Sequence, residues 1–275
     1  MSRDEEAATP GAMQVRVAYN AKHTASILRD SDRFYSSMAE KILARVRKER
    51  HGQAQLLDVG CGGGYLLREV VRHGSSVLKA THGLEISDMA LREARRQSPQ
   101  SRLVLGQGER LPYPQGHFDA VVCLGNLEHF MDPAAGAREL ARVCRRDGVA
   151  WILLPNSYYS GSLWRVILTG YGPNHHQVID RFATINEWRD LLEANQLCVD
   201  SIEPYNRFKW WKRLLPRNLA YHFLYSASPS IGSHQENCAL DLKVQGVQVD
   251  STIQSGPLPA DPPYGLHCLP PSDIP

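Results

Sequence analysis

The chain has 275 residues, of which 43% are hydrophobic and 22% are charged, values that suit one large globular α/β domain with additions. The formal net charge of +2 gives no argument for a nucleic-acid partner. No apolar run approaches the ~18 residues that a membrane-spanning helix needs, and the acidic first twelve residues do not resemble a secretory signal. The six cysteines form no CxxC pair, which supports neither a zinc site nor a disulfide framework and predicts a reduced, cytoplasmic compartment.

Residues 56–64, LLDVGCGGG, predict a buried strand that ends in a glycine-rich turn and opens a helix. Glycines tolerate a sharp turn and let a ligand approach the backbone, as at the nucleotide-type sites of α/β sheets. The dinucleotide fingerprint asks for a third glycine where this chain has Tyr65, and Gly64 comes one residue early. Asp58 places a charge in a buried strand, where it needs a partner such as a ligand ammonium and would repel a pyrophosphate.

The hydrophobic pattern predicts an alternation of strands and helices over most of the chain. The predicted helices are 31–50, 63–73, 87–97, 133–145 and 185–195, and the predicted strands are 55–59, 77–86, 102–106, 118–124, 149–154, 197–203 and 220–227. Residues 157–181 form an aromatic-rich insertion, which we interpret as a cap on the substrate side.

The pattern also predicts the domain organisation. Residues 1–12 are expected to be a disordered lead, 13–228 a single domain, and 229–275 a Pro-rich flexible tail.

Three stretches within about residues 31–203 resemble the class I S-adenosylmethionine-dependent methyltransferases, specifically the small-molecule group that includes ubiquinone-pathway enzymes. They are the acid-and-glycine run Asp58, Gly60, Gly62 and Gly64; the stretch Leu111, Pro112, Tyr113, Pro114, Phe118 and Asp119; and the pair Glu128 and His129 followed by Asp132 and Pro133. The resemblance implies a doubly wound, Rossmann-like, seven-stranded and mostly parallel sheet. It further implies an antiparallel last strand and an N-terminal helical cover, and the insertion at 157–181 adds a cap after strand five.

The same resemblance implies S-adenosylmethionine as the cofactor and assigns residues to it. Glu85, at the end of the second strand, would accept hydrogen bonds from the ribose hydroxyls, and Ile86 would lie beside the adenine. Gln107 stands where the family usually has Asp, so it is a weaker acceptor for the adenine amino group. The full set of implied cofactor contacts is Asp58, Gly60, Cys61, Gly62, Gly64, Glu85, Ile86, Gln107, Gly108 and Leu124.

Methyl transfer from a sulfonium is an in-line displacement that needs a general base only when the acceptor must lose a proton. The candidate bases are His129, His175 and His176, and His129 has the alternative of a structural histidine bonded to the backbone. Tyr19, Asn126 and His129 are the candidate acceptor-binding residues, and no metal site is expected.

The expected acceptor is an oxygen, nitrogen or carbon of a small-molecule or lipid-like compound. Base methylation of nucleic acid is disfavoured, because the Asn/Asp-Pro-Pro-aromatic motif is absent after strand four, where the chain reads LGNLEH. Two alternatives stay open: an NAD-dependent oxidoreductase on a related sheet, and a non-catalytic cofactor-binding subunit.

Residues 207–217, RFKWWKRLLPR, interleave five basic residues with Phe208, Trp210 and Trp211. This composition is typical of an interfacial membrane helix that makes peripheral membrane contact. A lid whose aromatic side chains face the pocket while its charges face water is the interpretation we favour over membrane contact.

Overall fold

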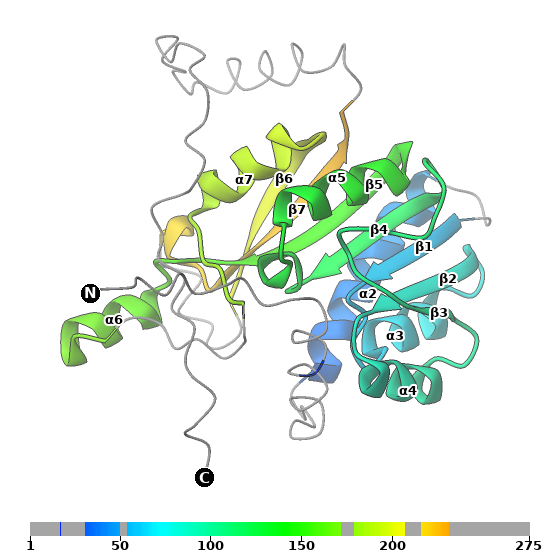
Figure 1. Cartoon of the computed structure of the whole chain (residues 1–275), viewed down its shortest axis with the longest axis horizontal. Coiled ribbons are helices and arrows are strands. Elements are labelled where there is room, and N and C mark those ends of the chain that lie inside the picture. Colours follow the sequence, from blue (N-terminus) through cyan, green and yellow to red (C-terminus); the bar gives the residue numbers. More distant parts are fainter. Residues whose placement is uncertain (1–16, 18–30, 50–53, 172–178, 207–215, 231–275) are drawn as a thin grey trace, which may run out of the picture.

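A computed structural model of the chain describes residues 17, 31–49, 54–171, 179–206 and 216–230 (Figure 1). The predictions for Tyr19, His175, His176, the lead at 1–12, nearly all of 207–217 and almost all of the tail lie outside the described residues. Within the described part, no helix is long and apolar enough to cross a membrane.

A seven-stranded sheet in the order β3-β2-β1-β4-β5-β7-β6 forms the centre of the described chain (Figure 1). Its strands are β1 (Ala54–Val59), β2 (Leu78–Glu85), β3 (Arg102–Leu105), β4 (Phe118–Leu124), β5 (Cys144–Pro155), β6 (Leu197–Tyr205) and β7 (His222–Pro229). Strands β1 to β5 pair in parallel, whereas β7 runs antiparallel between β5 and β6. The predicted sheet with its antiparallel last strand is confirmed.

Helices cover both faces of the sheet, as a doubly wound fold requires. The helices are α2 (Ser31–Glu49), α3 (Tyr65–Gly74), α4 (Asp88–Gln97), α5 (Pro133–Val143), α6 (Ser160–Thr169) and α7 (Ile185–Ala194). Helices α2, α3 and α4 contribute to one hydrophobic cluster, and α5 and α7 contribute to the other. In Figure 1, α6 stands away from both layers.

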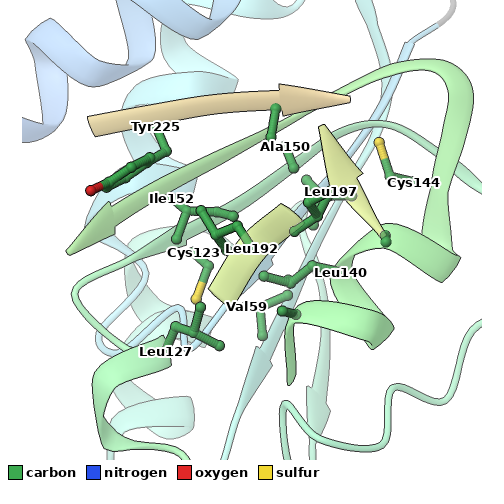
Figure 2. Packing of buried hydrophobic residues seen from close by; sticks show 14 of the residues in the cluster. Val59, Cys123, Leu127, Leu140, Cys144, Ala150, Ile152, Leu192, Leu197 and Tyr225 are labelled. Atoms are coloured by element: carbon green, nitrogen blue, oxygen red, sulfur yellow. The ribbon is translucent and has the colours of Figure 1, made fainter. Parts of the chain in front are cut away.

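The period of two along β1 divides its side chains between these clusters. Leu57 and Val59 lie in the α5–α7 cluster, whereas Leu56 lies in the α2–α3 cluster. Figure 2 shows the α5–α7 cluster, in which Val59, Leu127 and Tyr225 are all fully buried. Burial on both faces explains why the parallel strands read as apolar runs.

Side-chain caps explain why the helices begin near their predicted positions. The Ser87 and Asp132 side chains accept hydrogen bonds from the third residue of their helices, and Thr184 forms a capping box with Glu187. β5 is the main departure in boundaries, because it begins at Cys144, five residues before the predicted start. Cys198 on β6 is disulfide-bonded, which departs from the prediction of reduced cysteines.

Candidate functional site

The glycine-rich turn lies between β1 and α3 at the carboxyl edge of the sheet. Gly60, Gly62 and Gly64 have φ values of +75°, +51° and +76°, a left-handed conformation that side chains disfavour. Leu84 fixes the turn to β2, because its carbonyl accepts hydrogen bonds from the Gly60 N–H at 2.8 Å and the Cys61 N–H at 3.0 Å. A Cβ built on Gly62 would meet nothing within 4 Å. The turn is therefore rigidly held yet open at Gly62, as a ligand-binding backbone must be.

Glu85, the last residue of β2, holds this turn from the neighbouring strand. Its buried carboxylate accepts a hydrogen bond from the Gly62 N–H at 2.9 Å through one oxygen and from the Ser87 N–H at 2.9 Å through the other. Each carboxylate oxygen has a further lone pair. Glu85 can therefore accept ligand hydroxyl groups while it still fixes the turn.

Asp58 is the ionisable residue in the middle of this site, next to the turn on β1. Its side chain is buried, and within the described residues no hydrogen bond reaches its carboxylate. Burial, and secondarily the charge of Glu85, raise the pKa of Asp58 to about 8. Removing a carboxylate from water without a partner is costly. A cationic group of a ligand would supply the missing partner.

Cys61 lies inside the turn but is unsuited to nucleophilic chemistry. Burial, and then the charges of Asp58 and Glu85, raise the pKa of its thiol well above the usual value. The thiolate is the reactive form of cysteine, so Cys61 stays a neutral packing residue.

Asn126, after the end of β4, connects the next loop to the glycine turn. Its side-chain N–H₂ group donates hydrogen bonds to the carbonyls of Gly60 and Leu124, each at 3.0 Å. The side chain fills the place of a Gly60 Cβ, which would lie 2.4 Å from the Asn126 Cγ. Asn126 is predicted to bind the acceptor, but its side-chain N–H₂ group is thus already hydrogen-bonded to Gly60 and Leu124.

His129 lies in the 3₁₀ turn η1 (Leu127–His129) that follows β4. Its Nδ1 is 2.7 Å from the carbonyl oxygen of Ile179 and 3.5 Å from a carboxylate oxygen of Asp180, and its Nε2 is 3.6 Å from a carboxylate oxygen of Glu128. Since a carbonyl only accepts, Nδ1 carries the proton, and in the neutral ring Nε2 is the acceptor. The geometry thus includes the predicted backbone bond, made through Nδ1.

Arg181 strengthens the same connection and was missed by the sequence reasoning. Its guanidinium donates to the carbonyls of Phe130 and Met131, the latter at 3.0 Å. The chain returning from the insertion is therefore bonded to the loop after β4 at both His129 and Arg181. A lone Arg after a long insertion has no sequence signal that separates it from a surface residue.

The sheet order explains which predicted residues come together. Strands β3, β2, β1 and β4 are neighbours, so their carboxyl ends bring Gln107, Glu85, Asp58 and Asn126 to one edge. The predicted contacts Ile86, Gln107 and Leu124 are half-buried there. Gly108 is buried, and a Cβ on it would lie 2.0 Å from a ring atom of Phe130, so its lack of a side chain serves packing.

Helix α2 covers the start of α3 beside the glycine turn. The rings of Tyr35 and Tyr65 stack with centroids 5.9 Å apart, and the Arg68 guanidinium bonds the Asp32 carboxylate at 2.7 Å. Tyr65, which replaces the third glycine of the dinucleotide fingerprint, is thus part of the contact between these helices. Within the described residues, no group of His, Cys, Asp and Glu side chains has a metal-binding arrangement.

The central part of the chain is similar to known proteins. Residues 57–152 match the family described as "Methyltransferase domain". "Uncharacterized methyltransferase YcgJ" of Bacillus subtilis (strain 168) is 26% identical over 163 residues, which are 58% of this chain and 62% of that protein. The ubiquinone biosynthesis O-methyltransferase of Xanthomonas oryzae pv. oryzae (strain PXO99A) is 27% identical over 186 residues, covering 64% of this chain and 77% of that enzyme.

A solved structure shows the same fold. Magnesium protoporphyrin IX methyltransferase from Synechocystis PCC 6803, determined with bound SAH, aligns with a TM-score of 0.58 at 16% identity, over 80% of this chain and all of that one. This chain spans 62% of the length of the Bacillus relative and half that of a Neisseria meningitidis ubiquinone biosynthesis O-methyltransferase.

Proposed function

We propose that this chain, which carries a methyltransferase domain at residues 57–152, binds S-adenosylmethionine and transfers its methyl group to an oxygen, nitrogen or carbon of a small-molecule or lipid-like acceptor. The observation that carries the proposal is Asp58, a buried carboxylate without a hydrogen bond in the described structure, next to a glycine turn that Glu85 holds. An amino-acid-bearing nucleoside offers what these residues lack, because it combines a cation with ribose hydroxyl groups.

The residues of the site fit this cofactor in its parts. Glu85 has lone pairs left for the ribose, Asp58 accepts a cationic group, and the open side of Gly62 admits a ligand against the backbone. When bound, S-adenosylmethionine supplies a methyl group activated on a sulfonium. The protein then has to hold donor and acceptor in line and exclude water, which needs no catalytic triad.

His129 is the residue we assign to proton removal when the acceptor is a hydroxyl group. Its Nδ1–H bond to the Ile179 carbonyl fixes the tautomer so that Nε2 is the acceptor of the neutral ring, and the Glu128 carboxylate 3.6 Å from Nε2 would stabilise the imidazolium that forms. A nitrogen or carbon acceptor that keeps or has already lost its proton would not need this step. The assignment therefore predicts a requirement for His129 that depends on the acceptor.

The lipid-like part of the acceptor class and its setting are also proposals. The lipid-like acceptor is supported by relatives named for ubiquinone biosynthesis, among them the Xanthomonas enzyme, which is 27% identical. The proposal includes a cytoplasmic location, no nucleic-acid partner, and peripheral membrane contact through residues 207–217. The last point rests on the basic and aromatic composition of that segment.

Ligand-dependent thermal unfolding tests the cofactor half of the proposal. S-adenosylhomocysteine should raise the melting temperature progressively, since a ligand at 100 times its Kd stabilises the native state by about 2.7 kcal/mol. NAD should have no effect, because Tyr65 stands where the dinucleotide fingerprint has its third glycine. A shift with NAD alone would support the oxidoreductase instead.

Transfer of a labelled methyl group to a panel of phenolic, amine and lipid acceptors tests the second half. Product formation that requires Glu85 would establish the enzyme. Cofactor binding without product across the panel would favour the non-catalytic subunit.

A further inference from the structure

Helix α6 in the insertion exposes an unusual amount of apolar surface. Trp164, Ile167, Leu168 and Tyr171 are 61%, 71%, 76% and 70% exposed. Six of the ten exposed large hydrophobic residues in the described chain lie between Tyr158 and Tyr171. The other four are scattered one by one, which is normal for a protein surface. The gathering on α6 needs an explanation of its own.

The spacing of these residues shows that the apolar face of α6 points toward solvent and away from the core. Trp164, Ile167 and Leu168 have the i, i+3, i+4 spacing of one helix face, and Tyr171 follows just after the αL cap at Gly170. A surface helix normally turns such a face toward the core. Here Ser162 is buried instead, and Figure 1 shows α6 standing off the body.

Residues 156–159, which lead into α6, are firmly attached to the sheet beside the site. The Ser157 N–H donates to the Ala183 carbonyl at 3.1 Å, so the two ends of the insertion lie side by side. The ring of Tyr159 packs edge-on against Tyr221 with centroids 5.0 Å apart. The helix is therefore held in place at its start while its apolar face points to solvent.

The charges around this face select the kind of partner. Residues 156–171 contain no Asp or Glu, and Arg165 is their basic residue. The segment that leads into α6 also lies close to the residues on either side of a basic stretch. The Asn156 side chain donates a hydrogen bond to the Asn218 carbonyl at 2.7 Å, and the Tyr221 N–H donates one to the Asn206 side chain at 3.1 Å. The intervening sequence 207–217 carries five basic residues and no acid. An apolar face with aromatic residues and no acidic residue, with Arg165 on the same helix and a basic stretch whose flanks adjoin it, is complementary to an anionic lipid surface.

We propose that α6 docks this protein on a membrane surface that contains anionic phospholipids, with Trp164, Ile167 and Leu168 inserted among the lipids. A helix of 10 residues is about 15 Å long, too short to span a bilayer and suited to lie in its interface. The inference does not depend on the methyl-transfer proposal.

Vesicle flotation of the full chain tests this proposal. The protein should float with phosphatidylcholine vesicles that contain phosphatidylglycerol, and bind less to phosphatidylcholine alone. The Ile167→Ser/Leu168→Ser variant should lose at least about tenfold in partitioning, because two inserted side chains are removed. Val166→Ser is the matched control, since Val166 is exposed on the same helix but lies off the Trp164–Ile167–Leu168 face. Arg165→Gln should weaken binding about fivefold, and only to anionic vesicles.

Three results would overturn the proposal. The first is that the wild-type protein floats with neither vesicle type, and the second is that the double variant floats like the wild type. The third is that the wild type self-associates instead of binding vesicles, and that the double variant abolishes this self-association. Light scattering after size exclusion detects the third. Unchanged circular dichroism shows that the variants are folded. Vesicle binding by Glu85→Ala separates a failure of docking from a failure of cofactor binding.

Discussion

Replacing Asp58 with Asn should make the ligand-free protein more stable while weakening its cofactor binding. Asp58 keeps its proton in the folded chain up to a pKa of about 8, whereas the unfolded chain loses it near 3.8. Between these values the native state binds the extra proton, so this group makes stability fall as pH rises. At about 1.4 kcal/mol per pH unit, the loss accumulates to about 4 kcal/mol by pH 7. Asn carries no charge but still buries polar atoms, so we expect a gain of about 2–4 kcal/mol at pH 7.

Urea unfolding followed by circular dichroism at pH 4, 5, 6 and 7 measures this gain. The stability difference between Asp58→Asn and the wild type should be near zero at pH 4 and grow with each pH unit. Asp119→Asn is the matched control, because the buried Asp119 accepts from the Gln55 N–H at 2.8 Å and lies 3.4 Å from the Arg145 guanidinium, so its replacement should destabilise. A difference for Asp58→Asn that stays constant with pH, or a loss of stability, would refute the reasoning.

Three further changes test the rest of the site. Glu85→Ala should weaken S-adenosylhomocysteine binding by about 1–3 kcal/mol in calorimetric titration, the value expected for charge-assisted hydrogen bonds; full affinity would contradict its role. Gly60→Ala should destabilise the fold by about 2–3 kcal/mol, because its Cβ would lie 2.4 Å from Asn126 Cγ. In Gly116→Ala, at the similar φ of +61° but in open space, only the backbone strain of about 1 kcal/mol remains; equal losses would exclude the contact with Asn126. His129→Gln should leave S-adenosylhomocysteine affinity unchanged and lower turnover of a hydroxyl acceptor about 10²–10⁴-fold in steady-state assays; unchanged turnover would remove it as the base.

The sheet and its flanking helices could be predicted from the sequence because their signals are local. Strand β4 was predicted at its observed bounds, and α7 within one residue of its end. The apolar run of β4 and the cap at Thr184 fix these elements almost independently of the rest of the chain. The position of Glu85 at the end of β2 followed in the same way from its distance to the glycine turn.

The contacts between distant segments could not be predicted, because no local pattern specifies them. The Ile179 carbonyl that binds His129 is 50 residues away in sequence. The Asn126 side-chain amide donates to the Gly60 carbonyl, 66 residues away in sequence. This bond makes Asn126 a support of the glycine turn more than a contact for the acceptor. The insertion shows the same limit in another form. Its aromatic residues predict a cap on the substrate side, but no local pattern predicts that α6 turns several of its largest apolar side chains outward.

The bond between His129 and the Ile179 carbonyl has a consequence for how such proteins diversify. The orientation of the imidazole is set by the main chain of an insertion that we interpret as a cap on the substrate side. Exchange of that one segment between related chains would therefore alter both the shape presented to the acceptor and the aim of the ring, even though the sequence around the histidine stayed the same. New acceptor preferences would then arise in a single recombination event, with the cofactor half left intact.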